Sequence, residues 1–228
     1  MPEKTMKLYT VYNQDAREHC AMEKTLIEIE EPFFYFTTIQ QAAFIGVDIS
    51  VDALKLDYKE TTYVRYMGTG GPVYFDGGNI KTGFLVDKSY SSWKCIEWVV
   101  DALNSIGIPA ESKEDTNDIF LNGKKICGFG KKDCGEMKYI AFFFTLNLNL
   151  IEAEKSIILT KHVKNLGERA TAINVEMNKI IIPEQILNAL LDTLPKYFNY
   201  NTLPEILDIA LVDSNREQFY NTEWLMNK

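Results

Sequence analysis

The chain has 228 residues, of which 46% are hydrophobic and 25% are charged, and its formal net charge is −8. This composition is typical of a single folded domain with an apolar core, and no run of apolar residues is long enough to predict a membrane span. A net negative chain repels phosphate backbones, so we expect no nucleic-acid partner. The N-terminus has neither a secretory nor an organelle-targeting pattern, which favours a cytoplasmic protein.

The four cysteines include no Cys-x-x-Cys pair, and the chain has two histidines, His19 and His162. We therefore expect reduced thiols and no zinc site built from histidine and cysteine. A hard metal ion bound through carboxylates remains open.

In chain order, the apolar spacing predicts a helix over residues 16–29, followed by strands over 33–38 and 42–45 that we expect to form a hairpin. Short strands are predicted at 63–66 and 72–75, around a glycine cluster. Ser91 or Ser92 is a typical cap for a second helix, which has apolar residues at helical spacing from Trp93 to Leu103 and ends at Gly107.

Further along, Asn122-Gly123 predicts a hairpin between residues 119–121 and 124–126, because both turn positions tolerate a positive φ. Residues 139–150 alternate in polarity, which is typical of a strand buried on one face. From Pro183 the pattern is helical, and we expect Pro195 and Pro204 to divide it into shorter helical pieces. The sequence thus predicts an α+β fold in one domain over residues 1–228, with a mixed or antiparallel sheet, flanking helices and a helical C-terminal third.

Five of the thirteen glycines lie between residues 68 and 78. Glycines let backbone N–H groups approach an anion closely, but tight turns that serve only the sheet would need them equally. The cluster matches neither the P-loop nor the dinucleotide-binding fingerprint, so another kind of site is needed.

The run Arg65-Tyr-Met-Gly-Thr-Gly-Gly-Pro-Val-Tyr-Phe-Asp-Gly-Gly-Asn-Ile80 resembles the Arg-Arg-x-Ser-Gly-Gly-Gly-Ala-Val-Tyr-His-Asp-x-Gly-Asn-Leu signature of lipoate-protein ligases and their biotin-ligase-like relatives. Two more blocks follow in the family's order. Asn117 to Gly128 is similar to Asn-Asp-Leu-x-x-x-Gly-x-Lys-Ile-Ser-Gly, and Gln218 to Trp224 is similar to the Lys-Tyr-x-Ser-x-Glu-Trp that closes the catalytic domain.

The resemblance implies a biotin/lipoyl protein ligase-like mixed β-sheet flanked by α-helices. It also implies an ATP-dependent lipoate-protein ligase, which adenylates lipoic acid or octanoic acid with ATP and Mg²⁺. The acyl group would then pass to a lysine of a lipoyl-carrier domain or a similar carrier protein.

The same resemblance assigns roles to single residues. Lys125 would be the catalytic lysine that holds the acid's carboxyl oxygen beside the α-phosphate. The alternative is that Lys125 is an ordinary solvent-exposed lysine on a strand. Because adjacent strand residues face opposite sides, the sequence leaves open whether Lys125 or Lys124 points inward. Asn117 and Asp118 would bind Mg²⁺ through hard oxygen ligands, although such a pair also caps turns.

Other residues are implied in binding ATP or the adenylate. Asn79 would read the adenine edge, and Asp76 would order the loop. The remaining members of this set are Arg65, Gly70, Gly71 and Tyr74. Apolar candidates for an acyl tunnel are Tyr35, Phe44 and the Phe142 face of the alternating strand, which carries Phe142, Phe144, Leu146 and Leu148; each is more often plain core.

The sequence departs from the signature at Tyr66, which replaces the second Arg, and at Phe75, which replaces His. Loss of a guanidinium removes charge-assisted contacts with an anionic ligand. One alternative is therefore a non-catalytic relative, or one subunit of a two-part ligase whose accessory domain is a separate polypeptide. Another is an octanoyl or lipoyl transferase that needs no ATP. Such transferases carry their cysteine just upstream of the hairpin, where this chain has Ala110-Glu-Ser-Lys113, and we expect Cys127 in the hairpin strand to be a packed side chain.

Overall fold

The computed structural model describes residues 4–113, 116–158 and 166–226. Its strands and helices are β1 (Lys4–Gln14), α1 (Ala16–Ile29), β2 (Phe33–Ile39), β3 (Ala42–Ile45), β4 (Thr62–Arg65), β5 (Val73–Phe75), β6 (Asn79–Asp87), α2 (Ser92–Ser105), β7 (Glu111–Ser112), β8 (Ile119–Leu121), β9 (Lys124–Cys134), β10 (Met137–Phe144), α3 (Leu150–Ser156), α4 (Ile173–Glu176), α5 (Pro183–Tyr197), β11 (Tyr200–Pro204), α6 (Ile209–Tyr220) and α7 (Thr222–Met226). Short 3₁₀ turns lie at Val51–Ala53 and Leu166–Glu168.

Within these ranges the strands form two sheets, an eight-stranded one in the order β11-β1-β2-β6-β10-β9-β8-β7 and a three-stranded one in the order β4-β3-β5. β1 pairs in parallel with both β2 and β11, whereas β2, β6, β10 and β9 pair antiparallel. The predicted α+β fold with a mixed sheet is therefore confirmed.

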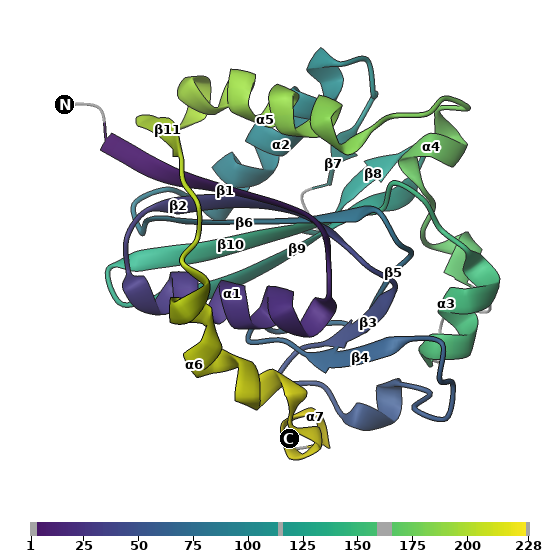
Figure 1. Ribbon diagram of the computed structural model, residues 1–228. Helices are drawn as coiled ribbons and strands as arrows, with labels where there is room; N and C mark the ends of the chain where they lie inside the picture. Colours follow the sequence, from purple (N-terminus) through teal and green to yellow (C-terminus); the bar gives the residue numbers. More distant parts are fainter. Residues whose placement is uncertain (1–3, 114–115, 159–165, 227–228) are drawn as a thin grey trace.

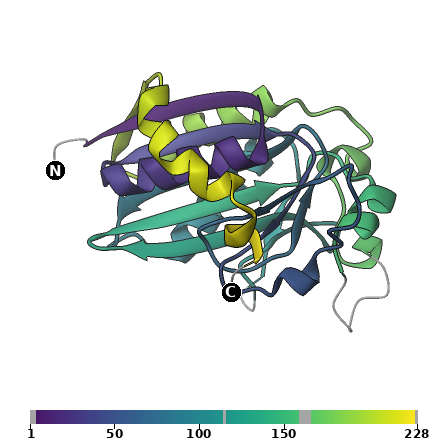
Figure 2. The ribbon, with the colours of Figure 1, turned by 60° about the horizontal axis from the view of Figure 1, so that its bottom comes forward.

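Helices cover both faces of the large sheet: α2 and α5 lie on one face, and α1 and α6 lie on the other (Figure 1). Figure 2 shows the small sheet beside the end of the β9–β10 hairpin that lies away from its turn. No helix among the described residues is both long and apolar enough to cross a bilayer.

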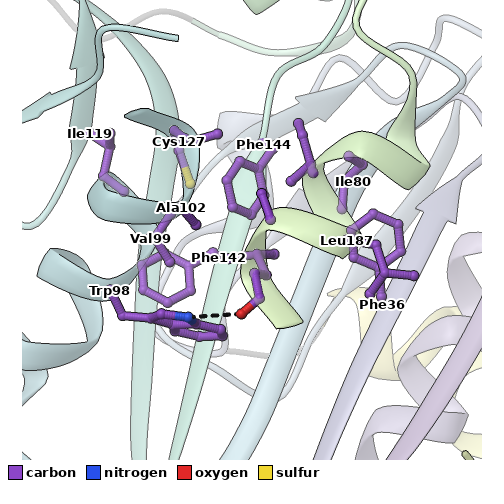
Figure 3. Close-up of a cluster of buried hydrophobic side chains, with 14 of the residues drawn as sticks. Phe36, Ile80, Trp98, Val99, Ala102, Ile119, Cys127, Phe142, Phe144 and Leu187 are labelled. Atoms are coloured by element: carbon purple, nitrogen blue, oxygen red, sulfur yellow. Dashed lines mark hydrogen bonds between the residues drawn. The ribbon is translucent and has the colours of Figure 1, made fainter. Parts of the chain in front are cut away.

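The core under α2 and α5 packs around Trp98, which is fully buried (Figure 3). Its indole N–H donates to the Leu190 carbonyl oxygen at 3.0 Å, joining the two helices. Phe142 and Phe144 of β10 belong to this core, but Phe143 belongs to the core on the α1 side. The prediction that this strand is buried on one face is therefore wrong, because β10 lies in the middle of a sheet with both faces covered.

Other local predictions met different outcomes. Helices α1 and α2 and the β8–β9 hairpin are confirmed, with Ser91 capping α2 and φ of 52° and 76° at Asn122 and Gly123. The predicted hairpin over 33–45 is wrong, because β2 joins the large sheet and β3 joins the small one.

The C-terminal third is not all helical. Pro195 lies inside the last turn of α5 instead of ending it, and the helix continues to the Phe198 N–H, which donates to the Leu194 carbonyl oxygen. Residues 200–204 then form β11, whose partners are Lys4 to Leu8 of β1. That pairing joins segments near opposite ends of the chain, so no local sequence pattern predicts it.

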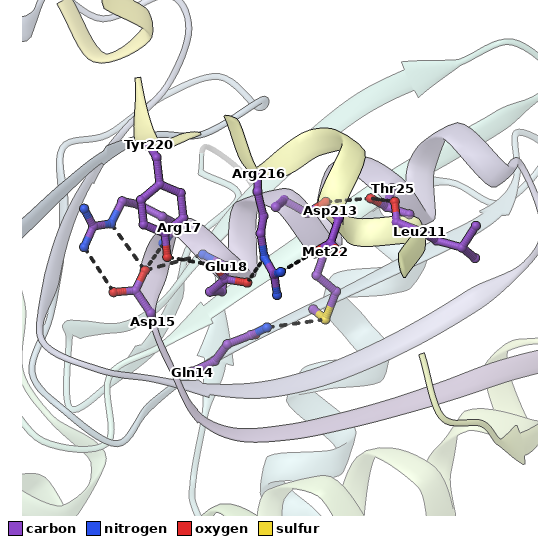
Figure 4. Close-up of polar contacts among 11 residues, drawn as sticks. Gln14, Asp15, Arg17, Glu18, Met22, Thr25, Leu211, Asp213, Arg216 and Tyr220 are labelled. Carbon is purple, nitrogen blue, oxygen red and sulfur yellow. Dashed lines mark hydrogen bonds and ion pairs between the residues drawn. The ribbon is translucent and has the colours of Figure 1, made fainter. Parts of the chain in front are cut away.

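Helix α6 is fastened to α1 by polar contacts (Figure 4). Glu18 accepts from the Arg216 Nε–H at 2.7 Å and from the Tyr220 hydroxyl at 2.8 Å. The Asn215 amide donates to Thr25 Oγ1 at 2.9 Å. These contacts carry the chain to α7, which lies beside β4.

A polar cluster is buried between α1 and the central strands. Lys81 and Glu23 form an ion pair with at most 1% of either side chain exposed. The Tyr35 hydroxyl donates to Glu23 at 3.0 Å and lies 2.7 Å from the Tyr139 hydroxyl. His19 Nε2 lies 3.3 Å from Glu23 Oε2. Burial and the nearby Lys81 charge lower the pKa of His19 to about 4, so its ring is neutral at pH 7.

The polar cluster requires a glycine at position 83 of β6, because there is no space for a side chain. A Cβ at Gly83 would lie 2.6 Å from Tyr35 Cε1 and 2.7 Å from the Tyr139 hydroxyl. We expect Gly83→Ala to lower the free energy of unfolding by roughly 1–3 kcal/mol through overpacking. Gly130→Ala on β9 is the matched control, since the nearest atoms to its Cβ are 3.5 Å and 4.0 Å away. Urea unfolding of both variants makes the comparison, and equal losses would contradict the crowding.

The buried histidine predicts acid sensitivity. The pKa of His19 is lower in the folded state than in the unfolded chain, so between about pH 6.5 and pH 4 the unfolded chain binds the additional proton. Stability should therefore fall as pH falls through this window, by up to the order of 3 kcal/mol. His19→Gln should flatten the loss, as measured by unfolding free energies at pH 7, 6, 5 and 4. An unchanged slope in His19→Gln would show that other groups cause it.

Candidate active site

A cavity of about 240 Å³ lies where the glycine loop after β4 meets strands β9 and β10. The loop and the start of β5 contribute residues 69–74, and the strands β9 and β10 contribute Lys125, Gly128, Phe129 and Phe143. Leu148 and the segments around 157 and 166–170 close the other side. The cavity thus combines apolar rings with cationic side chains.

The Lys125 side chain points into this cavity. Its ammonium lies 2.8 Å from Asp118 Oδ1, and 28% of the lysine side chain is exposed. Lys124 points elsewhere, with 44% of its side chain exposed and its ammonium 3.9 Å from Glu176 Oε1. The structure therefore decides between the two adjacent lysines in favour of Lys125. A Cβ at Gly128 would lie 3.3 Å from the Lys125 ammonium, so this glycine gives it space.

Sequence reasoning missed a second cation. The Lys125 N–H donates to the Arg169 carbonyl oxygen at 3.0 Å, and the Thr171 N–H donates to the Lys125 carbonyl oxygen at 3.0 Å. This short parallel bridge holds residues 169–171 beside β9, and Arg169 lines the cavity. Arg169 lies in none of the three motif blocks, so no sequence signal pointed to it.

The glycine loop is held in a fixed shape. Gly70 and Gly71 have φ of 92° and 114°, in the region that favours glycine. The Gly70 carbonyl oxygen accepts from the Gly46 N–H at 2.7 Å, and the Gly70 N–H donates to Asp48 Oδ1 at 2.9 Å. A Cβ at Gly46 would lie 2.6 Å from the Gly70 oxygen, so the two segments need glycine to approach. Gly70 and Gly71 line the cavity, but the Gly70 amide is already bonded to Asp48.

Two tyrosines stand in the cavity wall. Tyr74 is 6% exposed, and its hydroxyl has no hydrogen-bond partner among the described residues. Burial raises the pKa of Tyr74, so the phenol keeps its proton and can donate to a ligand. Tyr66, which occupies the position of the family's second Arg, is 4% exposed and donates to the Thr69 carbonyl oxygen at 2.5 Å.

Arg65 serves the loop and not the cavity. Its Nη1 donates to the carbonyl oxygens of Gly46 and Ile49, each at 2.8 Å, and its Nε donates to that of Leu225 at 3.1 Å. The Trp224 indole N–H returns a bond to the Arg65 carbonyl oxygen at 2.8 Å. Arg65 is 2% exposed and its guanidinium binds three backbone carbonyls, while its buried Nη2 has no partner among the described residues. The predicted contact of Arg65 with the ligand stays a prediction.

Asp76 and Asn79 also hold backbone. Asp76 Oδ2 accepts from the N–H of Asn149, the N-cap of α3, at 2.6 Å, and its role in ordering the glycine loop stays a prediction. Asn79 Oδ1 accepts from the N–H groups of Leu146 and Asn147 at 2.8 and 2.9 Å. Neither side chain is among the described residues that line the cavity, and the predicted contact of Asn79 with the adenine edge stays a prediction.

The candidates for an acyl tunnel need correction. Tyr35, Phe44 and Phe142 are not among the described residues that line the cavity, and Leu148 is the one member of the Phe142 face that lines it. The rings that line it are Tyr66, Tyr74, Phe129 and Phe143. The alternation along β10 places Phe143, and not Phe142, on the cavity side. Cys127 is 1% exposed, and burial raises the pKa of its thiol, so it is the packed side chain we expected.

Of the two predicted metal ligands, Asp118 lies beside Lys125, and Asn117 precedes it in the chain. Asp118 is partly buried and Asn117 is exposed. The described residues contain no cluster of three or more His, Cys, Asp or Glu that could enclose a metal ion. Two oxygen-bearing side chains next to a cationic cavity suit Mg²⁺, which is commonly held by one or two protein ligands together with water and substrate phosphates.

Solved structures of known proteins share the fold of this chain. A structure of lipoate-protein ligase A bound with ATP superimposes with a TM-score of 0.84 at 17% identity, covering 97% of this chain and 98% of that one. A bi-partite lipoate protein ligase from Thermoplasma acidophilum, solved with its E2 lipoyl domain, gives a TM-score of 0.85 at 16% identity over 98% and 96%. These similarities show the biotin/lipoyl ligase-like fold.

Among curated proteins, Lipoate--protein ligase 1 of Staphylococcus aureus is 26% identical over 197 residues. The match covers 79% of this chain and 60% of the relative, so the chain spans less than two thirds of that protein's length. The family model described as Lipoyl protein ligase A/B catalytic domain matches residues 12–195. Because this match covers most of the chain, the chain belongs to the lipoyl protein ligase A/B catalytic domain family.

Proposed function

We propose that residues 1–228 form one catalytic domain that activates lipoic acid or octanoic acid with ATP and transfers the acyl group to a lysine of a lipoyl carrier domain. The observation that carries this proposal is the Lys125 ammonium, which points into a cavity walled by the glycine loop and lies 2.8 Å from Asp118. The relative from Staphylococcus aureus is a lipoate-protein ligase, and a ligase of the same fold binds ATP, which supports this choice of substrates.

The chemistry has two steps. First, a carboxylate oxygen of the acid attacks the α-phosphorus of ATP, the bond to the bridging oxygen breaks, and pyrophosphate leaves with the electron pair. Next, the carrier lysine's amine attacks the acyl carbonyl, loses a proton, and displaces AMP to leave an amide. Both steps concentrate negative charge, so fixed cations in the cavity would lower the barriers.

Three residues of the cavity could stabilise this negative charge. Lys125 would lie between the carboxyl oxygen and the α-phosphate, because its stem passes over Gly128 and its ammonium reaches the cavity. Arg169, on the segment bonded to Lys125, would bind phosphate oxygens and supply charge that the family's second Arg supplies elsewhere. Tyr74 would donate its free hydroxyl to the acyl group or the phosphate.

Mg²⁺ belongs to the proposal through Asp118 and Asn117. When bound, the ion would neutralise charge on the triphosphate. Asp118 already orients Lys125 by its ion pair, so one carboxylate would serve both cations. We place this activity in the cytoplasm, where the four free cysteines would stay reduced.

Lys125→Ala should lower ATP-dependent pyrophosphate release by on the order of a hundredfold, because a positioned charge at the reacting phosphate is lost. Lys124→Ala is the matched control and should behave as the unaltered protein, since Lys124 points away from the cavity. The assay supplies ATP, Mg²⁺ and lipoic or octanoic acid, and follows pyrophosphate and then the mass of an added apo carrier domain.

The same assay separates the alternatives. Acyl transfer that proceeds equally well without ATP would replace the ligase with a transferase. Pyrophosphate release without carrier acylation would mean that a further domain or subunit is required for the second step, and no release with any acid would favour the non-catalytic relative.

Trp224→Phe tests whether the C-terminal contact positions the glycine loop. The change keeps an aromatic ring but removes the N–H bond to Arg65, so we expect a stability loss of about 1 kcal/mol and a higher KM for the acid. Trp93→Phe is the control, because it removes a similar bond to Glu97 at an exposed position on α2. Equal KM values in the two variants would show that the contact with Arg65 is structural only.

A further inference from the structure

Three residues that are neighbours across β9, β10 and β6, namely Gly128, Phe143 and Lys81, indicate how a bound acid would lie in the cavity. Phe143 is directly opposite Gly128 on one side and Lys81 on the other, so the three residues share one face of the sheet. The Lys125 ammonium lies over Gly128 at the cavity end of this row. An acid held by its carboxylate at Lys125 would therefore lay its tail over Gly128 toward Phe143.

Tyr66 stands at the inner end of that path. Its ring contacts the Phe143 ring edge to face, with 5.8 Å between centroids, and both rings line the cavity. Phe44 lies behind Tyr66 at 6.4 Å between centroids and does not line the cavity. A tail that passes Phe143 thus meets the face or edge of Tyr66.

The Tyr66 ring is fixed from two sides. In front, its hydroxyl donates to the Thr69 carbonyl oxygen at 2.5 Å, which ties the ring to the glycine loop. Behind it, the Lys81 ammonium lies 5.3 Å from the centroids of both Tyr66 and Phe143. A cation against an aromatic face is favourable, especially when it is shielded from water.

The space behind Tyr66 is filled by a buried ion pair. Lys81 is fully buried and paired with Glu23, which also accepts from the Tyr35 hydroxyl. An apolar tail that pushed past Tyr66 would have to separate or cover this pair, and stranding a buried charge is strongly unfavourable. The inner wall therefore cannot yield as a purely apolar wall could.

We propose that Tyr66, held against the buried Lys81–Glu23 pair, is the stop that limits the acid's chain length to medium-chain carboxylic acids. This inference rests on the proposed function. It makes Tyr66 a specificity-determining residue at the position where the family's sequence pattern has an arginine.

The test compares unbranched acids from hexanoic to dodecanoic acid in ATP-dependent pyrophosphate release. The unaltered protein should lose activity sharply beyond one chain length. Tyr66→Ala should raise kcat/KM for an acid two carbons longer by roughly tenfold relative to the shorter acid, because two more methylenes become buried. Tyr66→Phe keeps the ring and should keep the length limit, even if loss of the bond to Thr69 lowers the rate.

Tyr66→Leu is the second variant if Tyr66→Ala does not fold, since it shortens the side chain while retaining apolar packing. Thermal unfolding and circular dichroism establish which variants fold. An unchanged length limit in both shortened variants, or in the one that folds, would overturn the inference, as would an equal shift in Tyr66→Phe. Failure of the proposed function is distinct, because the unaltered protein would then release no pyrophosphate with any acid.

Discussion

The antiparallel ladder of β6, β10 and β9 is the constraint on which the site depends. Its register places Lys81, Phe143 and Gly128 in one row, so a buried cation, an aromatic wall and an open space follow one another across the sheet. A slip of one residue would exchange Phe143 for Phe142 and turn the wrong rings toward the cavity. The ladder is secure against such a slip because both faces of β10 are packed, one under α2 and α5 and the other under α1.

The glycine loop gains its shape from segments that are distant in the chain. Asp48 and Gly46 bind its backbone, while Arg65 links the neighbouring carbonyls to Leu225 near the C-terminus. A loop with several glycines has many conformations, so these bonds reduce the entropy that ligand binding would otherwise have to remove. Arg65, which matches the first arginine of the family's motif, binds the protein's own backbone.

Burying Lys81 and Glu23 is unfavourable unless each satisfies the other, and here three aromatic rings and a tyrosine hydroxyl complete their surroundings. The Lys81–Glu23 ion pair adds a charged interaction to a cavity wall that would otherwise consist of aromatic rings alone. Tyr66 and Phe143 line the cavity on one side and contact the Lys81 ammonium on the other. Phe44, which does not line the cavity, also contacts this ammonium. His19, whose pKa is lowered by burial and by the Lys81 charge, belongs to the same cluster and not to the cavity.

The sequence by itself determined those features that depend on neighbouring residues. Helical spacing located α1 and α2, a serine cap marked the start of α2, and Asn122-Gly123 located the β8–β9 hairpin. Motifs in the family's order indicated the fold and the glycine loop. Only the tertiary structure decided that β11 pairs with β1, that Lys125 and not Lys124 points into the cavity, and that Arg169 lies beside it. Arg65 and Asn79 show the same limit, since a motif identifies a residue type but not the atoms that its side chain will bind. The physical reason is that strand pairing and side-chain direction follow from contacts between distant segments, whose energies no local pattern contains.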